Sequence, residues 1–512
     1  MAKEGNRQVK GVAYRFVAAW VLSLGFCIVS SPGWSQGTGY NGYFLYSPNT
    51  TLRTTYLRDP NGTIVHSWTH TTTTGFSVAL GRDGTLYRSA VSGTGMQSAG
   101  VSGLIEAIGK SGEIKWSFPY RSANGALHHY MDVMPNGHVL ATAWELKSKD
   151  SATARSINAN GNVWIDQILE IAPPDSANPA AHVVWEWHMW DHLVPAAQAA
   201  AYPRRFNTAL RATGSTSGAA LAVGDWTHFN GISYDESRDE IAFSSRNFDE
   251  FYVIDHSTTV AEAADSVGGK RGHGGDLLYR WGAAANYGVD GSQYFTVTHA
   301  VKFIPPGYPG AGNFVVVHNR EAIAPNQTHC IEVQPPRDSL GAYVHVPGLA
   351  FGPAGALDTF TTSGYYNTTT GSAQRLPNGN TMCVESDNGM IREWDSTGAL
   401  VWQYQAVANT PVAYKYAPDD PGILALLGTT PIANPLLHRG MRPDVGRSGR
   451  VLAFRGLVGA RLEMFSLDGR RVYSGMIATD PYRIPDIAPH ETRWVRIRRG
   501  DHTETVAVGP AP

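Results

Sequence analysis

The chain has 512 residues, of which 41 are Lys or Arg and 43 are Asp or Glu, so its formal net charge is −2. A chain this close to neutral has no net positive charge to attract nucleic acid. Its central region also has no stretch of basic residues interleaved with aromatic residues. The 55 glycines and 11% aromatic residues suit many short strands joined by tight turns. A chain of this length is long enough to form several hydrophobic cores.

The N-terminal segment has the layout of an export signal. Lys and Arg residues precede an apolar run over residues 16–29, and small residues follow it. Because the run is short for a membrane span, we expect a cleaved signal peptide over residues 1–35, with a retained signal anchor as the alternative. The protein is then periplasmic, at the cell surface or secreted, without a stable membrane span. Cys330 and Cys383 would be its only cysteines, and they could pair in an oxidising compartment.

A turn followed by an alternating strand recurs along the body of the chain. Its return about every forty to fifty residues is typical of β-propeller blades, and the repeats alone would allow six to eight of them. No long amphipathic helix competes, and the Ala-rich stretch over residues 192–201 is the likeliest helical piece. The repeats lie at residues 58–68, 81–90, 109–118, 134–144, 376–386 and 395–404.

Residues 225–255 form the most informative segment. The stretches ISY and EIAFSS alternate apolar and polar residues on either side of DESRD, which predicts a strand–turn–strand unit. His228, Asn230 and Arg246 lie around this unit. A guanidinium supplies a fixed fork of donors, an amide supplies another, and an imidazole donates or changes its charge near neutral pH. The segment therefore predicts an anion site, with an ordinary polar hairpin as the alternative.

The chain changes character after the last repeat. Residues 409–446 are rich in Pro, Gly and polar residues, which indicates a linker. Residues 447–512 have the pattern of short strands in a small sandwich. The predicted organisation is all-β, with a propeller over residues 36–408 and a small C-terminal β-sandwich-like domain.

These motifs, in this order, resemble the bacterial arylsulfotransferase family over residues 38–405. In that family the Arg of an SSR or SVR run follows the His of a DW-x-H-x-N motif by 18 residues, and here 246 − 228 = 18. Further matching blocks include HHYMDVMPNGHVLATAWE from His128 and THAVKFIPPGYPGAGN from Thr298. The resemblance implies a six-bladed propeller that moves a sulfuryl group from a phenolic sulfate ester to a phenol acceptor. It also implies a ping-pong mechanism through a sulfated histidine, without a nucleotide sulfate donor.

The resemblance also implies the roles of single residues, which a central channel would gather from separate blades. His299 matches the histidine that is transiently sulfated, and His129 is preferred over His128 as the match to a further site histidine. No metal and no cofactor are expected. The expected catalytic residues are His299, His228, Arg246 and His129, and the expected substrate-binding residues are Asn230, His128 and Asn319.

Three departures from the family's pattern keep a second interpretation open. The usual QHDA is THAV at residues 298–301, HHD is replaced by HHY ending at Tyr130, and the FNNG-like run is VHNR ending at Arg320. An acidic residue that could orient the catalytic imidazole is therefore missing, and such a loss can reduce the rate by orders of magnitude. The alternative is a catalytically degenerate secreted propeller that binds an aromatic or anionic ligand.

Two other patterns have weaker functional meaning. His188 and His192 have the spacing of a helical zinc pair, but no general-base Glu lies between them, so we interpret them as packing residues. The stretch LEMFSLDGRRVYSG over residues 462–475 resembles a type IX secretion sorting domain, which would make that machinery a partner. An accessory β-domain is the alternative for this region.

Overall fold

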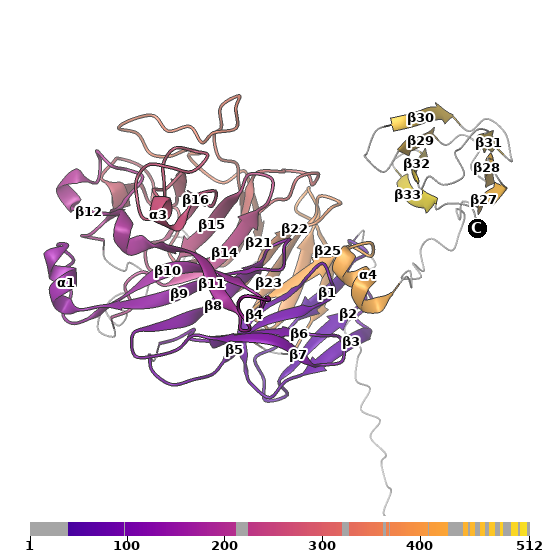
Figure 1. Ribbon diagram of the computed structural model, residues 1–512. Helices are drawn as coiled ribbons and strands as arrows, with labels where there is room; N and C mark the ends of the chain where they lie inside the picture. The colour runs from indigo at the N-terminus through magenta and orange to yellow at the C-terminus, as the bar shows by residue number, and fades with distance from the viewer. Residues whose placement is uncertain are drawn as a thin grey trace, which may run out of the picture.

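The computed structural model describes residues 39–428 except 97, 211–223, 320–326, 362–364, 368 and 408, and the strands between residues 444 and 508. The predicted signal peptide and Arg320 lie outside the described residues. Six four-stranded antiparallel sheets make up the main body, which confirms an all-β propeller with six blades (Figure 1).

Each blade takes its strands from one stretch of chain, except the first, which combines both ends of the propeller. Blade 1 contains β26 (Ala413–Tyr416), β1 (Tyr43–Tyr46), β2 (Thr54–Arg58) and β3 (Ile64–Thr69). Blade 2 contains β4 (Thr74–Leu80), β5 (Leu86–Val91), β6 (Gly103–Ile108) and β7 (Ile114–Pro119). Blade 3 contains β8 (Gly125–Val133), β9 (Val139–Lys147), β10 (Val163–Ala172) and β11 (His182–His188).

The other three blades have the same strand order. Blade 4 contains β14 (Phe229–Asp235), β15 (Glu240–Ser245), β16 (Glu250–Asp255) and β17 (Tyr279–Trp281). Blade 5 contains β18 (Thr298–Phe303), β19 (Phe314–His318), β20 (His329–Val333) and β21 (Asp358–Thr361). Blade 6 contains β22 (Ala373–Arg375), β23 (Thr381–Glu385), β24 (Met390–Trp394) and β25 (Leu400–Gln405).

Strand β26 closes the ring by pairing with β1, from Tyr43 opposite Tyr416 to Tyr46 opposite Ala413. The sequence analysis had placed this segment in the linker. A buried ion pair between Lys415 and Glu393, 2.5 Å apart, ties the closing strand to blade 6. Removing one partner of such a pair would leave an uncompensated buried charge, so the contact disfavours an open ring.

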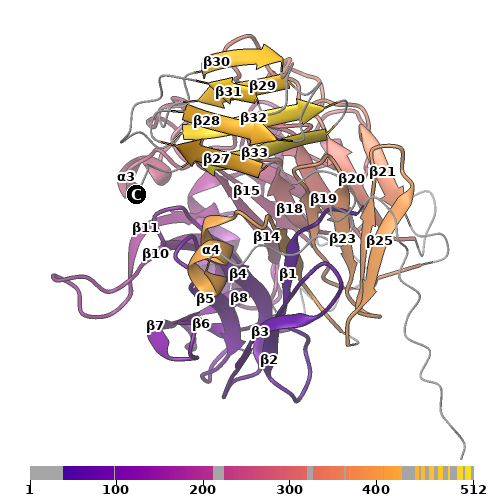
Figure 2. The same ribbon diagram turned by 90° about the vertical axis from the view of Figure 1, so that its right-hand side faces the viewer.

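Short helices lie at the edges of the blades. Helix α4 (Pro421–Leu427) begins at Asp420, whose side chain accepts from the Gly422 N–H, and it lies beside β4 and β5 (Figure 2). Its Ile423 and Leu426 pack in one apolar cluster with residues of blades 1 and 2. The other described helices are α1 (Lys149–Ala154) and α3 (Val260–Ala263), with the 3₁₀ helices η1 (Met189–His192), η2 (Ala196–Gln198) and η3 (Ala284–Tyr287).

The expectation of a helix over residues 192–201 is wrong, because this stretch contains the last residue of η1, the short strand β12 (Leu193–Val194) and the 3₁₀ helix η2. Pro195 precedes η2 and provides no backbone N–H, so the turn at η1 does not continue into it. Between η1 and η2, β12 pairs in parallel with β13 (Phe206–Asn207). Among the described helices, none has the length and apolar character needed to cross a membrane.

The C-terminal strands form two sheets. One sheet has the order β27 (Asp444–Ser448), β28 (Val451–Arg455) and β31 (Tyr482–Ile484). The other has the order β30 (Arg471–Met476), β29 (Arg461–Phe465), β32 (Arg493–Arg499) and β33 (His502–Val508). Two antiparallel sheets agree with the expected small β-domain.

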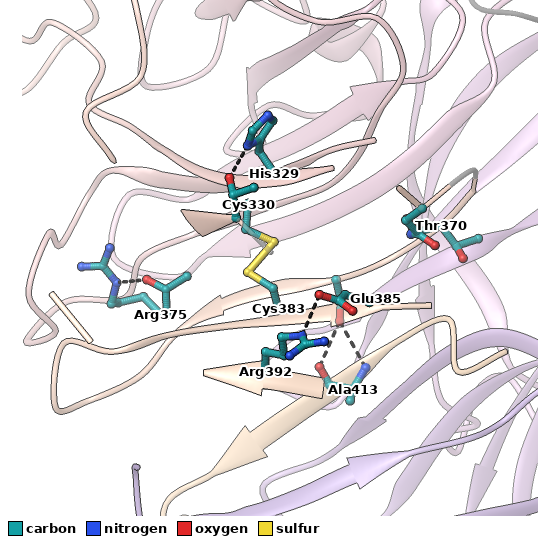
Figure 3. The surroundings of a disulfide bond; sticks show 12 residues. His329, Cys330, Thr370, Arg375, Cys383, Glu385, Arg392 and Ala413 are labelled. Atoms are coloured by element: carbon teal, nitrogen blue, oxygen red, sulfur yellow. Dashed lines mark hydrogen bonds and ion pairs between the residues drawn. A yellow bond between two sulfur atoms is a disulfide. The ribbon is translucent and has the colours of Figure 1, made fainter. Parts of the chain in front are cut away.

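Cys330 of β20 and Cys383 of β23 form a disulfide, so the pairing left open by the sequence occurs (Figure 3). Their Cα atoms are 6.4 Å apart, within the usual range for a bridge. The bond covalently joins blades 5 and 6.

We expect loss of this cross-link to destabilise the propeller. The two cysteines are 53 residues apart, and chain entropy for a loop of that size corresponds to about 4 kcal/mol, of which about 2–4 kcal/mol is commonly observed. Urea unfolding of Cys383→Ser should show this loss in the free energy of unfolding, and Cys330→Ser should match it. Identical urea midpoints for oxidised and reduced wild-type protein would contradict the prediction.

Candidate active site

The first strands of blades 2 to 5 are irregular at the end of the propeller where the predicted site residues lie. Each of these strands has a shift of register there, and a bulge turns side chains away from the regular ladder. Bulges of this kind are frequent beside active sites. The shifts lie between Thr74 and Val78, Leu127 and Met131, Phe229 and Ile232, and His299 and Lys302.

Unusual backbone conformations cluster at the same end. His228 has φ 52°, Ala300 has φ 49° and Thr370 has φ 55°, a region that non-glycine residues seldom adopt. A Cβ atom at Gly231 would lie 2.8 Å from the Ala300 nitrogen, so only glycine lets β14 and β18 approach this closely. Backbone strain held by the surrounding structure is typical of functional sites.

Three imidazoles form the centre of the candidate site. His128 and His129 belong to β8, and His228 directly precedes β14. The ring of His228 lies 5.0 Å from that of His128 and 5.8 Å from that of His129, centroid to centroid. All three residues are buried, at 2%, 2% and 7% exposure. The fold thus brings together histidines that are about 100 residues apart in sequence.

An acidic partner orients His228. Its Nδ1 lies 2.6 Å from Asp225 Oδ2, while Trp144 Nε1 donates to the other carboxylate oxygen at 3.1 Å. Burial raises the pKa of Asp225, but the charge of His228 and its hydrogen bond outweigh burial and hold that pKa below its usual value. The carboxylate is therefore ionised and favours an Nδ1–H on His228.

A backbone carbonyl orients His129. Gly100 O lies 3.1 Å from His129 Nδ1, and because a carbonyl only accepts, Nδ1 carries the hydrogen. Burial and the neighbouring His128, His228 and Arg246 lower the pKa of His129 well below its usual value. The ring is neutral, with an unprotonated Nε2.

His299 of β18 has its own orienting partner. Its Nδ1 donates to Asn319 Oδ1, and Asn319 Nδ2 donates to Thr370 O at 2.9 Å, which fixes the orientation of the amide. The Thr370 N–H donates to His299 Nε2 at 3.2 Å. Burial, then Arg246, holds the pKa of His299 well below its usual value, so the ring is neutral.

Asn319 thus takes the place of the acidic residue that the THAV sequence lacks. The amide oxygen accepts from the imidazole as a carboxylate would, without bringing a negative charge. Sequence analysis had grouped Asn319 with the substrate-binding residues, and the structure places it behind the ring of His299.

Arg246 lies just after β15 and near the imidazoles. Its backbone N–H donates to His228 O at 3.0 Å, and its charge lowers the pKa values of His299 and His129. The guanidinium is partly exposed and Nη1 lies 3.4 Å from Asn247 Oδ1. Arg246 supplies positive charge beside rings that are themselves neutral.

Asn230 is fully buried, and both ends of its amide bond to the protein. Nδ2 donates to Thr298 O at 2.6 Å, and Oδ1 accepts from Ser244 Oγ at 2.9 Å. The residue therefore links β14 to the backbone next to His299, whereas the sequence analysis predicted contact with substrate.

Tyr130, which replaces the acid of HHD, spans the ring. Its hydroxyl donates to Gly371 O at 2.6 Å, and this contact joins blade 3 to the start of blade 6, which is opposite in a ring of six. Farther along the same inner strands, Asp132 lies 3.4 Å from Lys302 Nζ. The ring of Tyr130 lies 4.9 Å from that of His129, centroid to centroid.

His188 and His192 have separate hydrogen-bond partners in the structure. His192 contacts Asp276 Oδ1 and Ala263 O, each at 2.8 Å, whereas His188 Nδ1 lies 3.2 Å from Glu145 Oε1. These partners agree with the packing role predicted from the sequence. Within the described residues, the potential metal-binding group with at least three His, Cys, Asp or Glu ligands is His128, His129 and His228.

Asp225 and Asp166 are site residues that the sequence analysis did not single out. Asp225 was visible in the quoted DW-x-H motif, three residues before the histidine that it orients. Asp166 of β10 accepts from Thr227 Oγ1 and from the Phe229 N–H, and burial raises its pKa well above the usual value. No local sequence signal marks Asp166, because Thr227 and Phe229 are more than 60 residues away from it.

Comparison of the sequence with known protein families finds a match to one family. Residues 35–261 match the model of the arylsulfotransferase (ASST) family, which is less than half of the chain and ends before His299 and Asn319. No curated protein matches the sequence.

The solved structures that match this chain are distant from it. A Bacteroides caccae protein of unknown function is 12% identical, with 73% of this chain and 98% of that chain covered and a TM-score of 0.40. The β-propeller domain of Myceliophteria thermophila Cps50 (Swd1) is 10% identical, with 82% and 94% covered and a TM-score of 0.36. The six-bladed assignment rests on the sheet order of this chain.

Proposed function

We propose that this protein is an aryl-sulfate sulfotransferase, which moves a sulfuryl group from a phenolic sulfate ester to a phenol acceptor. The observation that carries the proposal is the convergence of His129, His228, Arg246 and His299 on one buried site. The family match over residues 35–261 supports the same reaction class.

Arg246 and His228 would hold the sulfate group. A guanidinium presents a planar fork to two oxygens, and positive charge is stabilising where the transferring group is anionic. Asp225 compensates a positive charge on His228, so this ring can offer an Nε2–H to sulfate or to the leaving phenolate.

His299 would be the nucleophile of a two-step reaction. Its Nε2 lone pair attacks sulfur, an N–S bond forms, and the S–O bond to the aryl group breaks with its electron pair going to the phenolate oxygen, which takes the Nε2 proton of His228. In the second step the acceptor oxygen attacks sulfur, the N–S pair returns to Nε2, and the acceptor loses its proton. The unprotonated Nε2 of His129 is suited to accept that proton, and exchange with solvent then returns His129 and His228 to their starting protonation states.

Thr370 must release His299 before the first step. Its N–H bond at 3.2 Å uses the lone pair that would attack sulfur. Asn319 keeps the hydrogen on Nδ1 during this exchange, because its oxygen remains on that side of the ring. The donor itself supplies the sulfuryl group, so neither a nucleotide nor a cofactor takes part.

A propeller that binds an aromatic or anionic ligand without turnover is the second candidate. It is favoured by the hydrogen bonds that occupy both nitrogens of His299. Such a protein would bind an aryl sulfate and leave it intact.

Release of a coloured phenol from a generic aryl sulfate separates the two candidates. With a phenol acceptor present, the enzyme should turn over continuously and form the acceptor's sulfate ester. Without acceptor it should release about one equivalent and then slow, because the covalent intermediate accumulates. Ligand binding with no release in either arm would favour the second candidate.

For the C-terminal strands we propose a sorting role after export to the periplasm, with type IX secretion machinery as the partner. Deleting residues 445–512 should leave specific activity unchanged, because few contacts are expected to cross the preceding linker. In its own host, the truncated protein should accumulate in the periplasm, as fractionation and immunoblotting would show. Normal delivery of a soluble, active truncation would remove the sorting role, and an insoluble truncation would show that these strands support the propeller.

A further inference from the structure

The imidazoles of His128, His129 and His228 form a three-ring group that the proposed contact of His228 with sulfate does not explain by itself. One nitrogen from each ring lies within 4.8 Å of the others, and all three residues are buried. Sulfate oxygens accept hydrogen bonds and therefore need N–H donors. A neutral imidazole with its hydrogen on the outer nitrogen presents a lone pair instead.

Each ring has an acceptor on one side. Gly100 O lies against His129 Nδ1 at 3.1 Å, and Asp225 Oδ2 lies against His228 Nδ1 at 2.6 Å. On the third ring, Asp166 Oδ1 lies 2.9 Å from His128 Nε2. Histidines that bind a metal through one nitrogen usually direct the other toward a carboxylate or a backbone carbonyl.

His128 provides an independent observation. Its side chain is fully buried, and neither ring nitrogen has a hydrogen-bond partner of good geometry within the described residues. Asp166 Oδ1 is likewise without such a partner. Buried polar atoms in this state are costly, and a cation bound at His128 Nδ1 would satisfy one nitrogen and align the other with Asp166.

We propose that His128, His129 and His228 bind one divalent transition-metal ion of the Zn²⁺ type, with an open fourth position. Three imidazole nitrogens form a ligand set that suits zinc and leaves room for water or substrate. Tetrahedral Zn–N bonds of about 2.0–2.1 Å place ligand nitrogens about 3.3 Å apart. The nitrogens lie within 4.8 Å, so ring movements on the order of 1 Å would complete the site.

The metal is expected to inhibit sulfuryl transfer. Zn²⁺ would use the Nε2 atoms of His129 and His228, which the proposed reaction needs for proton transfer and sulfate binding. Metal and aryl sulfate should therefore exclude each other. This part of the proposal rests on the proposed function, whereas metal binding itself does not.

Calorimetric titration of the metal-free full chain with Zn²⁺ tests binding directly. One equivalent should bind, and His128→Ala and His129→Gln should each weaken the affinity by about 100-fold or more, since loss of even an outer partner costs about 10–100-fold. Asp225→Asn should weaken the Zn²⁺ affinity by about 10–100-fold, because it changes only the outer partner of His228. His138→Ala is the matched control, because His138 pairs with Glu170 away from the three rings.

Substitution of Co²⁺ gives a second readout. Its visible absorption should show a tetrahedral site in the wild type and in His299→Ala, and should be lost in His129→Gln. Unchanged Zn²⁺ affinity in folded His128→Ala and His129→Gln, or no binding at all, would overturn the metal site.

Activity measurements test the metal site separately from the proposed sulfotransferase function. Chelator treatment should leave aryl sulfate turnover intact, and added Zn²⁺ should raise KM for the aryl sulfate with little change in kcat. One equivalent of bound Zn²⁺ in a protein without turnover would retain the metal site and refute the transferase. Turnover in a protein that binds no Zn²⁺ would do the opposite.

Discussion

His299→Ala is expected to reduce acceptor-dependent phenol release by about 10⁴-fold or more, because removing a nucleophile removes the covalent route. The initial one-equivalent release should disappear as well. Stopped-flow absorbance of the freed phenol measures both quantities. The residue lies near the start of β18, which pairs with β19 through the backbone, so a smaller side chain should leave the strand in place.

The matched control is His182→Ala, which removes an imidazole from β11 on the outer edge of blade 3. This variant should retain both the burst and the steady rate. The free energy of unfolding should fall by about 1–3 kcal/mol more in His299→Ala than in His182→Ala, because the buried ring of His299 is hydrogen-bonded at both nitrogens whereas His182 is only partly buried. Wild-type turnover in folded His299→Ala would rule out the sulfated intermediate.

Arg246→Lys should lose about tenfold or more in kcat/KM for the aryl sulfate. A lysine keeps the charge but replaces the planar fork by a single ammonium, so two sulfate oxygens can no longer be bound in parallel. The backbone contact from Arg246 N–H to His228 O does not depend on the side chain, so stability should change little. Initial-rate kinetics over a range of donor concentrations measures the effect.

The corresponding control is Arg82→Lys, which alters an exposed pair with Glu236. An exposed ion pair contributes at most about 1 kcal/mol, and this one does not involve the site residues. Unchanged kinetics in both variants would show that Arg246 has a structural role.

The blades were predictable because the turn-plus-strand repeats are local. Asn-Gly, Asp-Gly, Ser-Gly or Thr-Gly turns followed by alternating strands recur in blades 1, 2, 3 and 6, for example around Gly137 and Gly379. Strand β26 was missed because it is short and lies among Pro, Gly and Asp residues that indicate a linker. Its identity as a strand depends on β1, nearly 370 residues earlier in the chain, and no local pattern reports that pairing.

The sequence predicted the site residues that belong to one local motif. It did not predict the roles of residues whose hydrogen-bond partners are distant in the chain. His228 and Arg246 lie together because one hairpin carries both. The replacement of an acid after His299 was visible, but the orienting role of Asn319 depends on the pairing of β18 with β19. The role of Tyr130 could not be predicted, since its hydroxyl bonds to a carbonyl 241 residues away.

The contact of Tyr130 joins opposite sides of the ring beside the histidines. It ties the inner strand of blade 3 to the start of blade 6, so the two sides of the propeller are held together next to the site. In the proposed two-step reaction the spent phenol leaves before the acceptor phenol arrives, so the two phenols occupy this site in turn. A protein that holds the sulfuryl group on its own side chain during this exchange needs no room for both substrates at once.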